Sequence, residues 1–426
     1  MRPNNWRIVF VSLSLCSCAL GAPLDLVTWN VESGDNDPAV IAAQLGNLPE
    51  FHLYGLAEVD PVNAGRYRQA VGDQFESLMS ETGFRDRLLM MYDRTRLELL
   101  EQQELARYEG LLMNDVNRRH RSPLFATFRD RVTEESFKVV LVHLARGSSS
   151  LRTEQATALR AWLQDQTLPV LGIGDFNFDY SIVSERGNLA YKAFVLDDYW
   201  RWVRPDPLID TNWSDSDGNG HDNFPNSVLD FAFVGGQARP WVSESEVVVR
   251  VDDFPDDNST SDHRPVSLRI TEMWTPEPGD VDWDRQVTVA DLDLLTAKLL
   301  ADTEDFAFDV NGDRSIDRRD RDVWIREVRQ LYVGDANLDG GFDDRDIVQV
   351  FVSGEYRDGL AQNSTWATGD WDGDGEFDER DLVAAFIDGG YNKGPRGAMP
   401  VPEPNACWLA WNVVCIGFFA WRALRT

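Results

Sequence analysis

The residues best suited to chemistry are polar side chains within or at the ends of apolar, strand-like runs in the first two thirds of the chain. Carboxylates, amides and two imidazoles occur in this setting: Asn30, Glu58, His143, Asp175, Asn177, Asp230, Asp262 and His263. A buried strand that ends in an unpaired carboxylate is costly, so these acids need a partner. A divalent metal is the simplest partner that several oxygen donors can share. The pattern therefore favours a metal site with imidazoles beside it.

Each of these residues also has an ordinary structural explanation when it is considered alone. Asn30 and Glu58 fit turn caps or surface acids, and His143 fits a core imidazole with satisfied hydrogen bonds. The Gly-Asp-Phe-Asn segment at 174–177 fits a common turn, and the Asp-His pair at 262–263 fits an exposed pair. It is the complete set that points to one site.

The elements that must position these side chains are short β-strands with few helices between them. Strand-like runs occupy residues 24–31, 53–59, 87–92, 124–128, 138–144, 169–176, 228–234, 246–251 and 265–270. Apolar spacing predicts helices over residues 37–48 and 151–165. Many strands with few helices predict a layered α/β fold for residues 23–275.

A family resemblance follows from the order of the motifs. "TWNV", "AEV", "LVHL", "GDFN", "LDF" and "SDHRPV" occur in that order along residues 24–275. This series resembles the endonuclease/exonuclease/phosphatase superfamily, which includes deoxyribonuclease I-like nucleases and sphingomyelinases. The resemblance implies a four-layer α/β sandwich, with the site at one edge of two facing sheets. It also implies a hydrolase that acts on phosphate esters by metal-assisted attack of water.

The resemblance assigns a role to each residue of the set. It implies that Asn30, Glu58 and Asp262 hold a Mg²⁺ or Mn²⁺ ion, with Glu58 as the principal ligand. The other five residues are expected to be catalytic: Asp175 orients or deprotonates the attacking water, Asn177 contacts the phosphate, His143 donates to a non-bridging oxygen, His263 faces the scissile phosphate, and Asp230 orients His263. A nucleic acid is the leading candidate for the phosphate-ester substrate.

Two further features of this region bear on the site. Arg152 and Gln155 follow His143 on the predicted helix, and we expect them to brace the loop after His143. Arginines cluster at 117–122 and 129–131, either as a platform for phosphate or as a solvated connector, and the connector is favoured.

Four acidic loops of twelve residues recur in the last third of the chain, at 280–291, 309–320, 335–346 and 370–381. Each has Asp or Asn at loop positions 1, 3 and 5 and Asp at position 12, and three also have Asp at position 9. Side-chain oxygens at loop positions 1, 3, 5 and 12 can surround a hard cation such as Ca²⁺. A single loop of this kind would also fit a solvated acidic coil, but four loops with the same spacing favour calcium binding. The expected calcium ligands are Asp280, Asp282, Asp284, Asp291, Asp309, Asn311, Asp313, Asp317, Asp320, Asp335, Asn337, Asp339, Asp343, Asp346, Asp370, Asp372, Asp374, Asp378 and Asp381.

An apolar helical run follows each loop, and position 12 is Asp rather than Glu. These loops resemble dockerin type I repeats, arranged as small all-α pairs over residues 276–332 and 333–392. The resemblance implies a cohesin-like partner, although a calcium-stiffened spacer fits the sequence equally well. Without metal each loop would crowd several carboxylates together, so we expect this region to fold only with calcium.

Both ends of the chain have the composition of targeting segments. Residues 1–22 have two arginines, a short apolar run and small residues at the exit, which predicts a secretory signal peptide. A short membrane helix and a lipoprotein signal are the alternatives. Residues 393–426 contain Val-Pro-Glu-Pro, an apolar run and terminal arginines, and they resemble a linker followed by a PEP-CTERM sorting signal, which an exosortase-type enzyme processes. The alternative is a permanent C-terminal anchor.

Composition narrows the range of functions. The formal net charge is −31, and acidic residues are concentrated after residue 276, which disfavours tight binding to nucleic acid phosphates. The only cysteines are Cys16, Cys18, Cys407 and Cys415, so residues 23–392 contain no disulfide. The prediction is a secreted protein of the bacterial envelope or extracellular space that hydrolyses phosphate esters. The alternative is a non-catalytic matrix or binding protein.

Overall fold

The computed structural model of the chain describes residues 22–396, apart from 35, 116–119, 216–218, 251–258, 304 and 314. Residues 1–21 and 397–426, which carry the predicted signal peptide and sorting signal, lie outside the described residues. The chain divides into two units between Thr275 and Pro276. We call residues 22–275 the sandwich unit and residues 276–396 the repeat unit. Within the described residues, no helix is long and apolar enough to cross a membrane.

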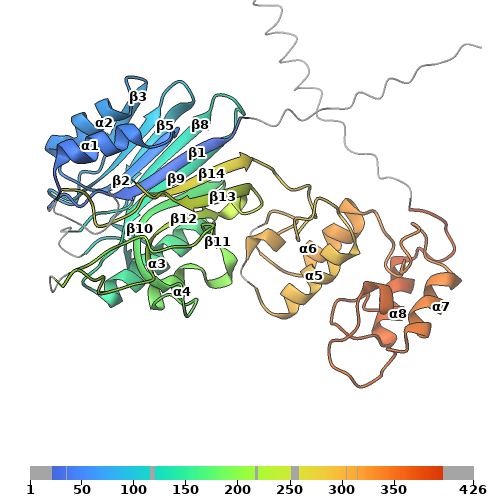
Figure 1. Ribbon diagram of the computed structural model, residues 1–426. Coiled ribbons are helices and arrows are strands. Elements are labelled where there is room, and N and C mark those ends of the chain that lie inside the picture. The colour runs from blue at the N-terminus through green and yellow to red at the C-terminus, as the bar shows by residue number, and fades with distance from the viewer. Residues whose placement is uncertain are drawn as a thin grey trace, which may run out of the picture. The chain divides into compact units, whose positions relative to one another are not determined.

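Two six-stranded β-sheets form the centre of the sandwich unit (Figure 1). In the first sheet the order is β13 (Val242–Val247), β14 (Val266–Glu272), β1 (Leu24–Asn30), β2 (Leu53–Val59), β4 (Arg87–Asp93) and β3 (Phe75–Met79). In the second sheet the order is β11 (Trp200–Trp202), β12 (Ser227–Gly235), β10 (Val170–Ser181), β9 (Ser136–His143), β8 (Leu124–Asp130) and β5 (Leu97–Glu104). A short hairpin pairs β6 (Arg107–Tyr108) with β7 (Leu111–Leu112).

The two sheets have matching centres. Strands β1 and β2 run parallel in the first sheet, and β9 and β10 run parallel in the second, whereas the other neighbours are antiparallel. These central strands are apolar along most of their length because both of their faces are buried. The last strand, β14, lies between β13 and β1, so the end of the unit completes the sheet that its first strand begins.

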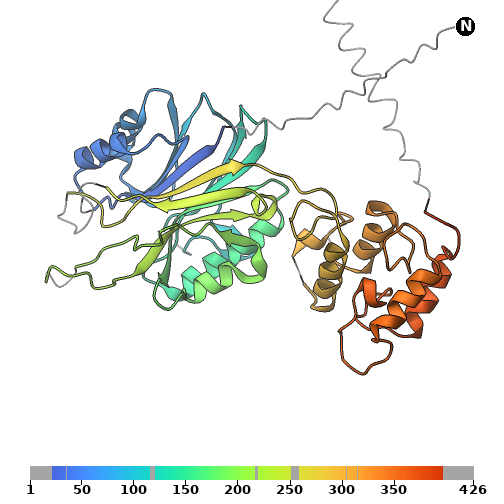
Figure 2. The ribbon, with the colours of Figure 1, turned by 45° about the vertical axis from the view of Figure 1, so that its right-hand side comes forward.

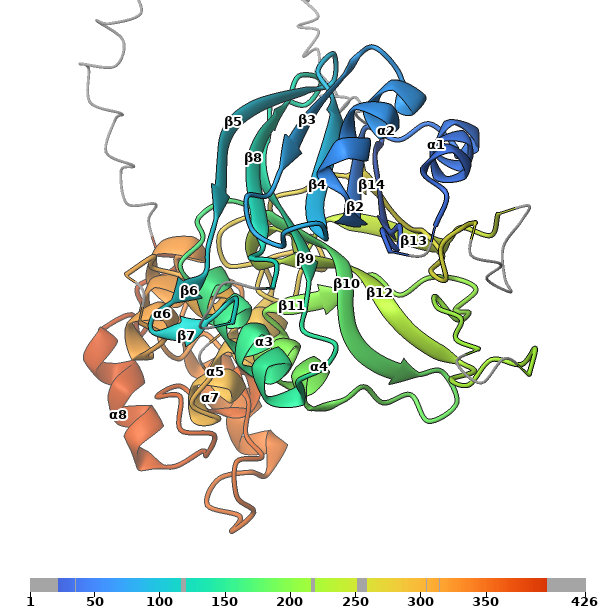
Figure 3. The same cartoon turned by 90° about the vertical axis from the view of Figure 1, so that its left-hand side faces the viewer.

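Three hydrophobic clusters separate four layers. One cluster lies between the sheets and takes side chains from both, among them Leu26, Leu53, Leu141 and Ile173. A second packs the outer face of the first sheet against α1 (Pro38–Asn47) and α2 (Ala64–Val71), and a third packs the second sheet against α3 (Ser149–Gln164) and α4 (Leu189–Phe194). Figure 3 shows the two helix pairs on opposite outer sides of the sheets. The four-layer α/β sandwich is therefore confirmed.

One predicted strand is displaced. The run at 246–251 was expected to be a strand, but β13 spans Val242–Val247, and residues 248–250 leave the sheet. The Ser/Glu alternation of β13 fits a strand with one exposed face, and the apolar valines that suggested the later start lie at its end and beyond it. Because the chain leaves the sheet after Val247, Arg250 reaches the buried region beneath Trp29.

The repeat unit contains α5 (Val289–Leu300), α6 (Arg318–Val323, continued by a π-helical turn at Trp324–Val328), α7 (Asp344–Ser353) and α8 (Glu379–Asp388). These helices are coloured orange to red in Figure 2. Each begins inside one of the acidic loops with a reciprocal capping box, in which loop position 9 is the N-cap and position 12 is the third helical residue. The expected small all-α repeats are confirmed. One hydrophobic core runs through all four repeats, from Val281 to Ala385.

Candidate metal-dependent active site

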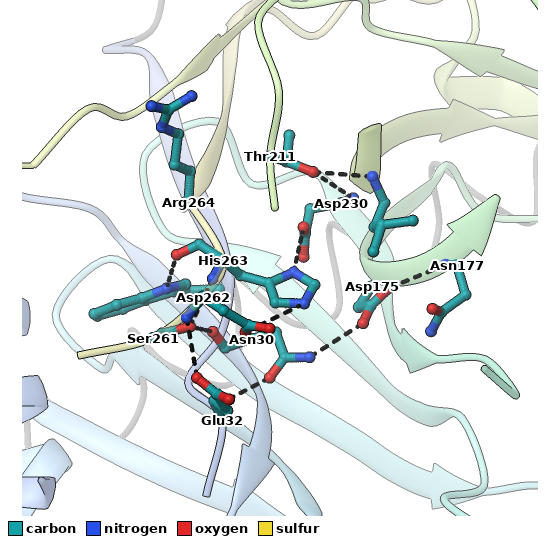
Figure 4. Close-up of polar contacts among 12 residues, drawn as sticks. Asn30, Glu32, Asp175, Asn177, Thr211, Asp230, Ser261, Asp262, His263 and Arg264 are labelled. Atoms are coloured by element: carbon teal, nitrogen blue, oxygen red, sulfur yellow. Dashed lines mark hydrogen bonds and ion pairs between the residues drawn. The ribbon is translucent and has the colours of Figure 1, made fainter. Parts of the chain in front are cut away.

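Three strands of the second sheet bring predicted residues into one row. Asp175 of β10 stands opposite His143 of β9 on one side and opposite Asp230 of β12 on the other. Asn30 ends β1 in the facing sheet, and its side-chain Nδ2 donates to Asp175 Oδ2 at 3.1 Å. This hydrogen bond joins the two sheets at the edge where the site was expected (Figure 4).

Glu58 and His143 complete one half of the site. Asn30 Nδ2 also donates to Glu58 Oε1 at 3.1 Å. His143 Nε2 lies 3.3 Å from Asp175 Oδ2 and 3.6 Å from Glu58 Oε1. Asn177 is anchored beside them, because its backbone N–H donates to Asp175 Oδ1 and its side chain donates to the carbonyl of Leu144. One carboxylate, that of Asp175, is thus contacted by three of the other predicted residues.

His263 forms the other half of the site together with two carboxylates. Its Nδ1 lies 2.7 Å from Asp230 Oδ2, and its Nε2 lies 3.7 Å from Asp262 Oδ1 (Figure 4). Burial alone would lower the pKa of His263, but the negative charges of Asp230, Asp262 and Asp175 outweigh it and hold the pKa well above its usual value. The imidazole is therefore held in its protonated form. Hydrogen bonds and ion pairs thus join the eight predicted residues into two groups.

The backbone at the site adopts conformations that L-residues avoid. Glu58 has φ of 55° and Asn177 has φ of 50°, both in the left-handed region. Each lies where a strand departs from regular pairing, after Leu56 in β2 and after Asp175 in β10. Such irregularities re-aim side chains and are concentrated at functional sites.

Burial disfavours the ionised forms of the carboxyl groups of Asp175 and Glu58. Burial is the largest cause that raises the pKa of Asp175, to about 6, and the nearby charge of Asp230 adds to it. Burial likewise raises the pKa of Glu58, and it lowers that of His143 well below the usual value. A cation bound beside buried acids that lie close together in this way would favour their ionised forms.

The donor set fits a hard divalent cation. Asp175 and Asp230 each bring a carboxylate oxygen within 4.8 Å of the other and of a ring nitrogen of His263. Among the described residues, buried Asp230 Oδ1 has no hydrogen-bond partner. The expected ligands Asn30, Glu58 and Asp262 supply further oxygens on the two sides of this group. Their assignment as the metal ligands remains a prediction.

Several residues of the site were not predicted. Glu32 accepts the backbone N–H of Asp262 at 3.0 Å, and Thr211 Oγ1 accepts the backbone N–H of Asp230 at 3.2 Å. Ser261 Oγ donates to the carbonyl of Asn30 at 2.5 Å and accepts the N–H of His263 at 3.0 Å, which ties β14 to β1. Ser261 had a sequence signal, because it directly precedes the Asp-His pair. Glu32 also had a sequence signal, because it directly follows the strand-like run 24–31, whereas Thr211 had none.

The bracing role expected of Arg152 and Gln155 is confirmed. Arg152 Nη1 donates to the carbonyls of Ala145 and Arg146, and Gln155 Oε1 accepts the N–H of Ala145 at 2.9 Å. These contacts fix the loop that follows His143. Of the arginine cluster at 117–122, residues 117–119 lie outside the described residues. Arg121 Nη1 lies 3.8 Å from Asp86 Oδ2. The positive charge of Arg121 opposes the rise in the pKa of Glu58 that burial causes.

The four acidic loops share one internal geometry. The position-12 carboxylates, Asp291, Asp320, Asp346 and Asp381, are buried and accept backbone N–H groups from the start of their own loops. They also accept the N–H of position 9, which closes the loop onto its helix. Each loop is therefore shaped by its own backbone around its position-12 side chain.

Other loop acids cap helices or lie in clusters of potential ligands. Asp317, Asp343 and Asp378 at position 9 accept the N–H two residues later, so they serve as helix N-caps. Asp280, Asp282 and Asp291 form one cluster of potential ligands, and Asp370, Asp372 and Asp374 form another. Buried Asp280 Oδ1 and Asp372 Oδ1 have no hydrogen-bond partner among the described residues, and burial raises the pKa of Asp335 and of Asp370 to about 6. These loops fit a hard cation such as calcium.

Comparison with known proteins identifies one segment of the chain. The family model of the dockerin type I domain matches residues 278–329, which contain the first two acidic loops. This match confirms the dockerin resemblance for the first pair of loops. No curated protein matches the chain.

Solved structures resemble the sandwich unit at low sequence identity. An endonuclease/exonuclease/phosphatase family protein from Bacteroides thetaiotaomicron is 17% identical with a TM-score of 0.45, covering 59% of this chain and 98% of that one. A mannosyl-6-phosphatase from the same species is 15% identical with a TM-score of 0.44, covering 57% and 98%. TDP2 from D. rerio, in complex with a single-strand DNA product, is 16% identical with a TM-score of 0.46, covering 58% and 98%.

Proposed function

We propose that the sandwich unit is a divalent-metal-dependent hydrolase of phosphate esters, with a nucleic acid phosphodiester as the first candidate substrate. One observation carries the proposal. Asn30, Glu58, His143, Asp175 and Asp230 lie in strands of two sheets, and His263 precedes β14. Hydrogen bonds and ion pairs join them into two groups, and the ligand atoms of Asp175, Asp230 and His263 lie within 4.8 Å of one another. A structural role does not require buried acids and imidazoles to converge, because apolar packing would be less costly.

The metal would be held by Glu58, Asn30 and Asp262, as the sequence predicted, with the carboxylate of Asp175 close by. When bound, it supplies positive charge that neutralises the phosphoryl group and favours ionised carboxylates. Asn30 holds the carboxylates of Glu58 and Asp175 close to each other, because its side-chain Nδ2 donates to both. The strained backbone at Glu58 fixes the direction of its side chain.

Proton transfer falls to Asp175 and His263. Asp175 is held by the N–H of Asn177 and the amide of Asn30, so its carboxylate is oriented to accept the proton of an attacking water. His263 is kept as an imidazolium by Asp230, which leaves its Nε2–H as a charged donor for a phosphoryl oxygen. His143, whose pKa is lowered by burial, is a neutral donor beside Asp175.

A substrate panel tests this proposal. Plasmid, single-stranded DNA, RNA, sphingomyelin, phosphatidylinositol phosphates and bis-p-nitrophenyl phosphate are incubated with the full chain and Mg²⁺ or Mn²⁺, and with chelator. We expect metal-dependent hydrolysis that falls by at least about 10³-fold in His263→Ala. If wild type and His263→Ala are equally inactive on every substrate, the protein is a non-catalytic matrix or binding protein.

The repeat unit supports a second part of the proposal. Its four loops would bind calcium, and its first pair, which matches the dockerin family model, would engage a cohesin-like partner. Together with the targeting segments expected at residues 1–22 and 393–426, this match supports a location outside the bacterial cytoplasm. A calcium titration of the full chain tests the first claim, since fewer than three bound ions would contradict it.

A further inference from the structure

Arg250 is a buried arginine that belongs to none of the expected site residues. It lies three residues beyond β13 and is 8% exposed. Its Nη2 donates to the carbonyl of His263 at 2.8 Å and to that of Ser261 at 3.3 Å, and its Nη1 donates to Thr260 Oγ1 at 2.8 Å. The guanidinium thus contacts three of the four residues from 260 to 263, at the entrance to β14.

Trp29, in β1, also donates a hydrogen bond to the backbone carbonyl of His263. Its Nε1 donates to the carbonyl of His263 at 2.8 Å, and its ring packs 4.4 Å from the centre of the Arg250 guanidinium. Trp29 directly precedes Asn30 in β1. One carbonyl oxygen, that of His263, therefore accepts two buried hydrogen bonds, and the cation–π contact locks the two donors together.

We infer that Arg250 is a positioning residue for His263, an inference that rests on the proposed hydrolase function. Asp230 fixes the ring of His263, whereas Arg250 and Trp29 fix its main chain. A misplacement of about 1 Å at a catalytic group can lower the rate by about 10²-fold. Arginine suits this task because its planar donors reach several carbonyls at once, which lysine cannot do.

The test compares Arg250→Ala and Arg250→Lys with Arg201→Ala. Arg201 is a matched control, because it also donates to backbone carbonyls, those of Arg239 and Trp241, but contacts none of residues 260–263 in any described hydrogen bond. We expect kcat to fall by 10-fold or more in Arg250→Ala, with KM changed by less than about threefold. Millimolar guanidinium should restore part of kcat in Arg250→Ala and none in His263→Ala. Arg201→Ala should leave kcat within twofold of wild type.

Hydrogen exchange of the backbone amides of residues 259–264 separates failure of this inference from failure of the proposed function. We expect exchange at least 10-fold faster in Arg250→Ala and unchanged in Arg201→Ala, whether or not a substrate is found. If Arg250→Ala does not fold, the same two measurements are made on Arg250→Lys. Exchange at wild-type rates in a folded variant, or a loss expressed only in KM, overturns the role of Arg250.

A separate observation concerns the residue that follows position 12 of each acidic loop. It is aliphatic in three loops, as Leu292, Ile347 and Leu382, but it is Arg321 in the second loop. Arg321 is 5% exposed. Its Nη1 and Nη2 donate to the carbonyls of Trp371 and Asp370 at 2.9 and 2.8 Å, and its Nε donates to Thr296 Oγ1 at 3.0 Å.

These contacts join the second loop to the fourth. Arg321 stands next to Asp320, the position-12 residue of loop 309–320, and it holds the main chain at positions 1 and 2 of loop 370–381. Trp366 adds a parallel link, because its ring packs 5.5 Å from the Arg321 guanidinium, its backbone N–H donates to Asp293 and its indole donates to the carbonyl of Asp335. The start of each loop in the second pair is thus supported by contacts that involve the first.

We propose that Arg321 couples calcium binding in loop 309–320 to calcium binding in loop 370–381. A calcium ion bound by Asp320 would hold the first turn of α6 more firmly, and this turn carries the guanidinium that contacts the fourth loop. Linkage requires the effect to be reciprocal, with a typical coupling of 5- to 150-fold in affinity. The two pairs of loops would therefore bind calcium cooperatively.

Calorimetric titration of the chelated full chain with calcium chloride tests the coupling. Asp320→Ala removes the second site, and we expect it to weaken one of the remaining sites at least fivefold. The same change in an Arg321→Met background should weaken none further. Arg329→Met is the control, since Arg329 also donates to a loop carbonyl, that of Val287, but within the first pair. If Asp320→Ala leaves the remaining affinities within twofold of wild type, the coupling does not exist. Tryptophan fluorescence at each calcium step gives the same comparison if Arg321→Met folds only with the ion.

Discussion

At the scale of single residues, the contact between Asp230 and His263 sets the electrostatics of the site. Asp230 is fully buried, and its Oδ2 lies 2.7 Å from Nδ1 of the imidazole. Asp230→Asn removes the largest of the charges that raise the pKa of His263 and gives the ring a neutral partner. We expect kcat to fall by about 10²-fold or more. Steady-state kinetics on the best substrate measures this, and a kcat within threefold of wild type would contradict the role of Asp230.

Asp175 leads to a prediction about stability. Its folded pKa of about 6 lies above the usual value of 3.8, so the metal-free folded state binds this proton more tightly than the unfolded state does. Its contribution to stability is therefore greatest at low pH and is lost as the pH rises from about 4 to about 6. Asp175→Asn should stabilise the chelated protein at pH 8 by about 1–3 kcal/mol and have little effect near pH 4.

Denaturant unfolding of the sandwich unit at both pH values, with and without Mg²⁺, checks this prediction. Saturating metal should reduce the advantage of Asp175→Asn, because a bound cation stabilises the wild-type carboxylate. A variant that is less stable than wild type at pH 8 in chelator would show that the lost hydrogen bonds outweigh the removed charge.

The residues of the site were predictable to the extent that they interrupt apolar runs. Asp175 and His263 stand out because a carboxylate or imidazole beside a buried strand needs a partner. Glu32, Thr211 and Arg250 were missed because each acts through main-chain groups of residues far away in sequence. Thr211 has no local signal, whereas Glu32 follows the apolar run 24–31 and Arg250 interrupts the run 246–251, and neither was recognised.

At the scale of elements, the pairing of β9 with β10 places His143 next to Asp175 in the site. Gly174 precedes Asp175 with φ of 140°, and a Cβ there would lie 2.1 Å from the carbonyl oxygen of Val142. Gly174→Ala should therefore separate the two strands at the point where His143 and Asp175 face each other. We expect a loss of about 2–4 kcal/mol in stability and of most activity.

Gly147→Ala is the control for this prediction, because a Cβ at Gly147 meets no atom within 4 Å and the residue lies in the loop after His143. Thermal unfolding and turnover are measured for both variants. If Gly174→Ala matches Gly147→Ala in both, the close approach of the strands is not needed.

The elements found from the sequence are those with a continuous apolar pattern. The central strands β1, β2, β9 and β10 were located because burial on both faces leaves little room for polar residues. The edge strand β5 was missed, since its polar outer face resembles a loop. The helix α4 has only six residues, too few to show a period.

At the scale of the whole molecule, the two units should respond differently to calcium. Buried Asp335 and Asp370 have pKa values of about 6 without a counter-ion, so at neutral pH their ionised forms destabilise the empty loops. In chelator we expect the repeat unit to melt at least about 10 °C lower than with calcium, as one transition. The melting temperature of the sandwich unit should shift by less than that of the repeat unit. Calorimetry that shows identical scans with and without chelator would contradict this.

Catalysis should not require the repeat unit. All the residues proposed to act on the substrate precede Thr275, and the two units divide at that residue. A chain that ends at Thr275 should hydrolyse a small soluble substrate with kcat/KM within about threefold of the full chain. A loss of more than 10-fold would show that residues 276–396 contribute to the site.

The position of β14 has a consequence for biosynthesis. This final strand inserts between β13 and β1, and its entrance supplies Asp262 and His263. A ribosome must therefore release the whole unit before the first strand gains its antiparallel neighbour, and any product cut short before residue 259 lacks its imidazolium. The proposed hydrolase would therefore have no complete site until translation has passed β14.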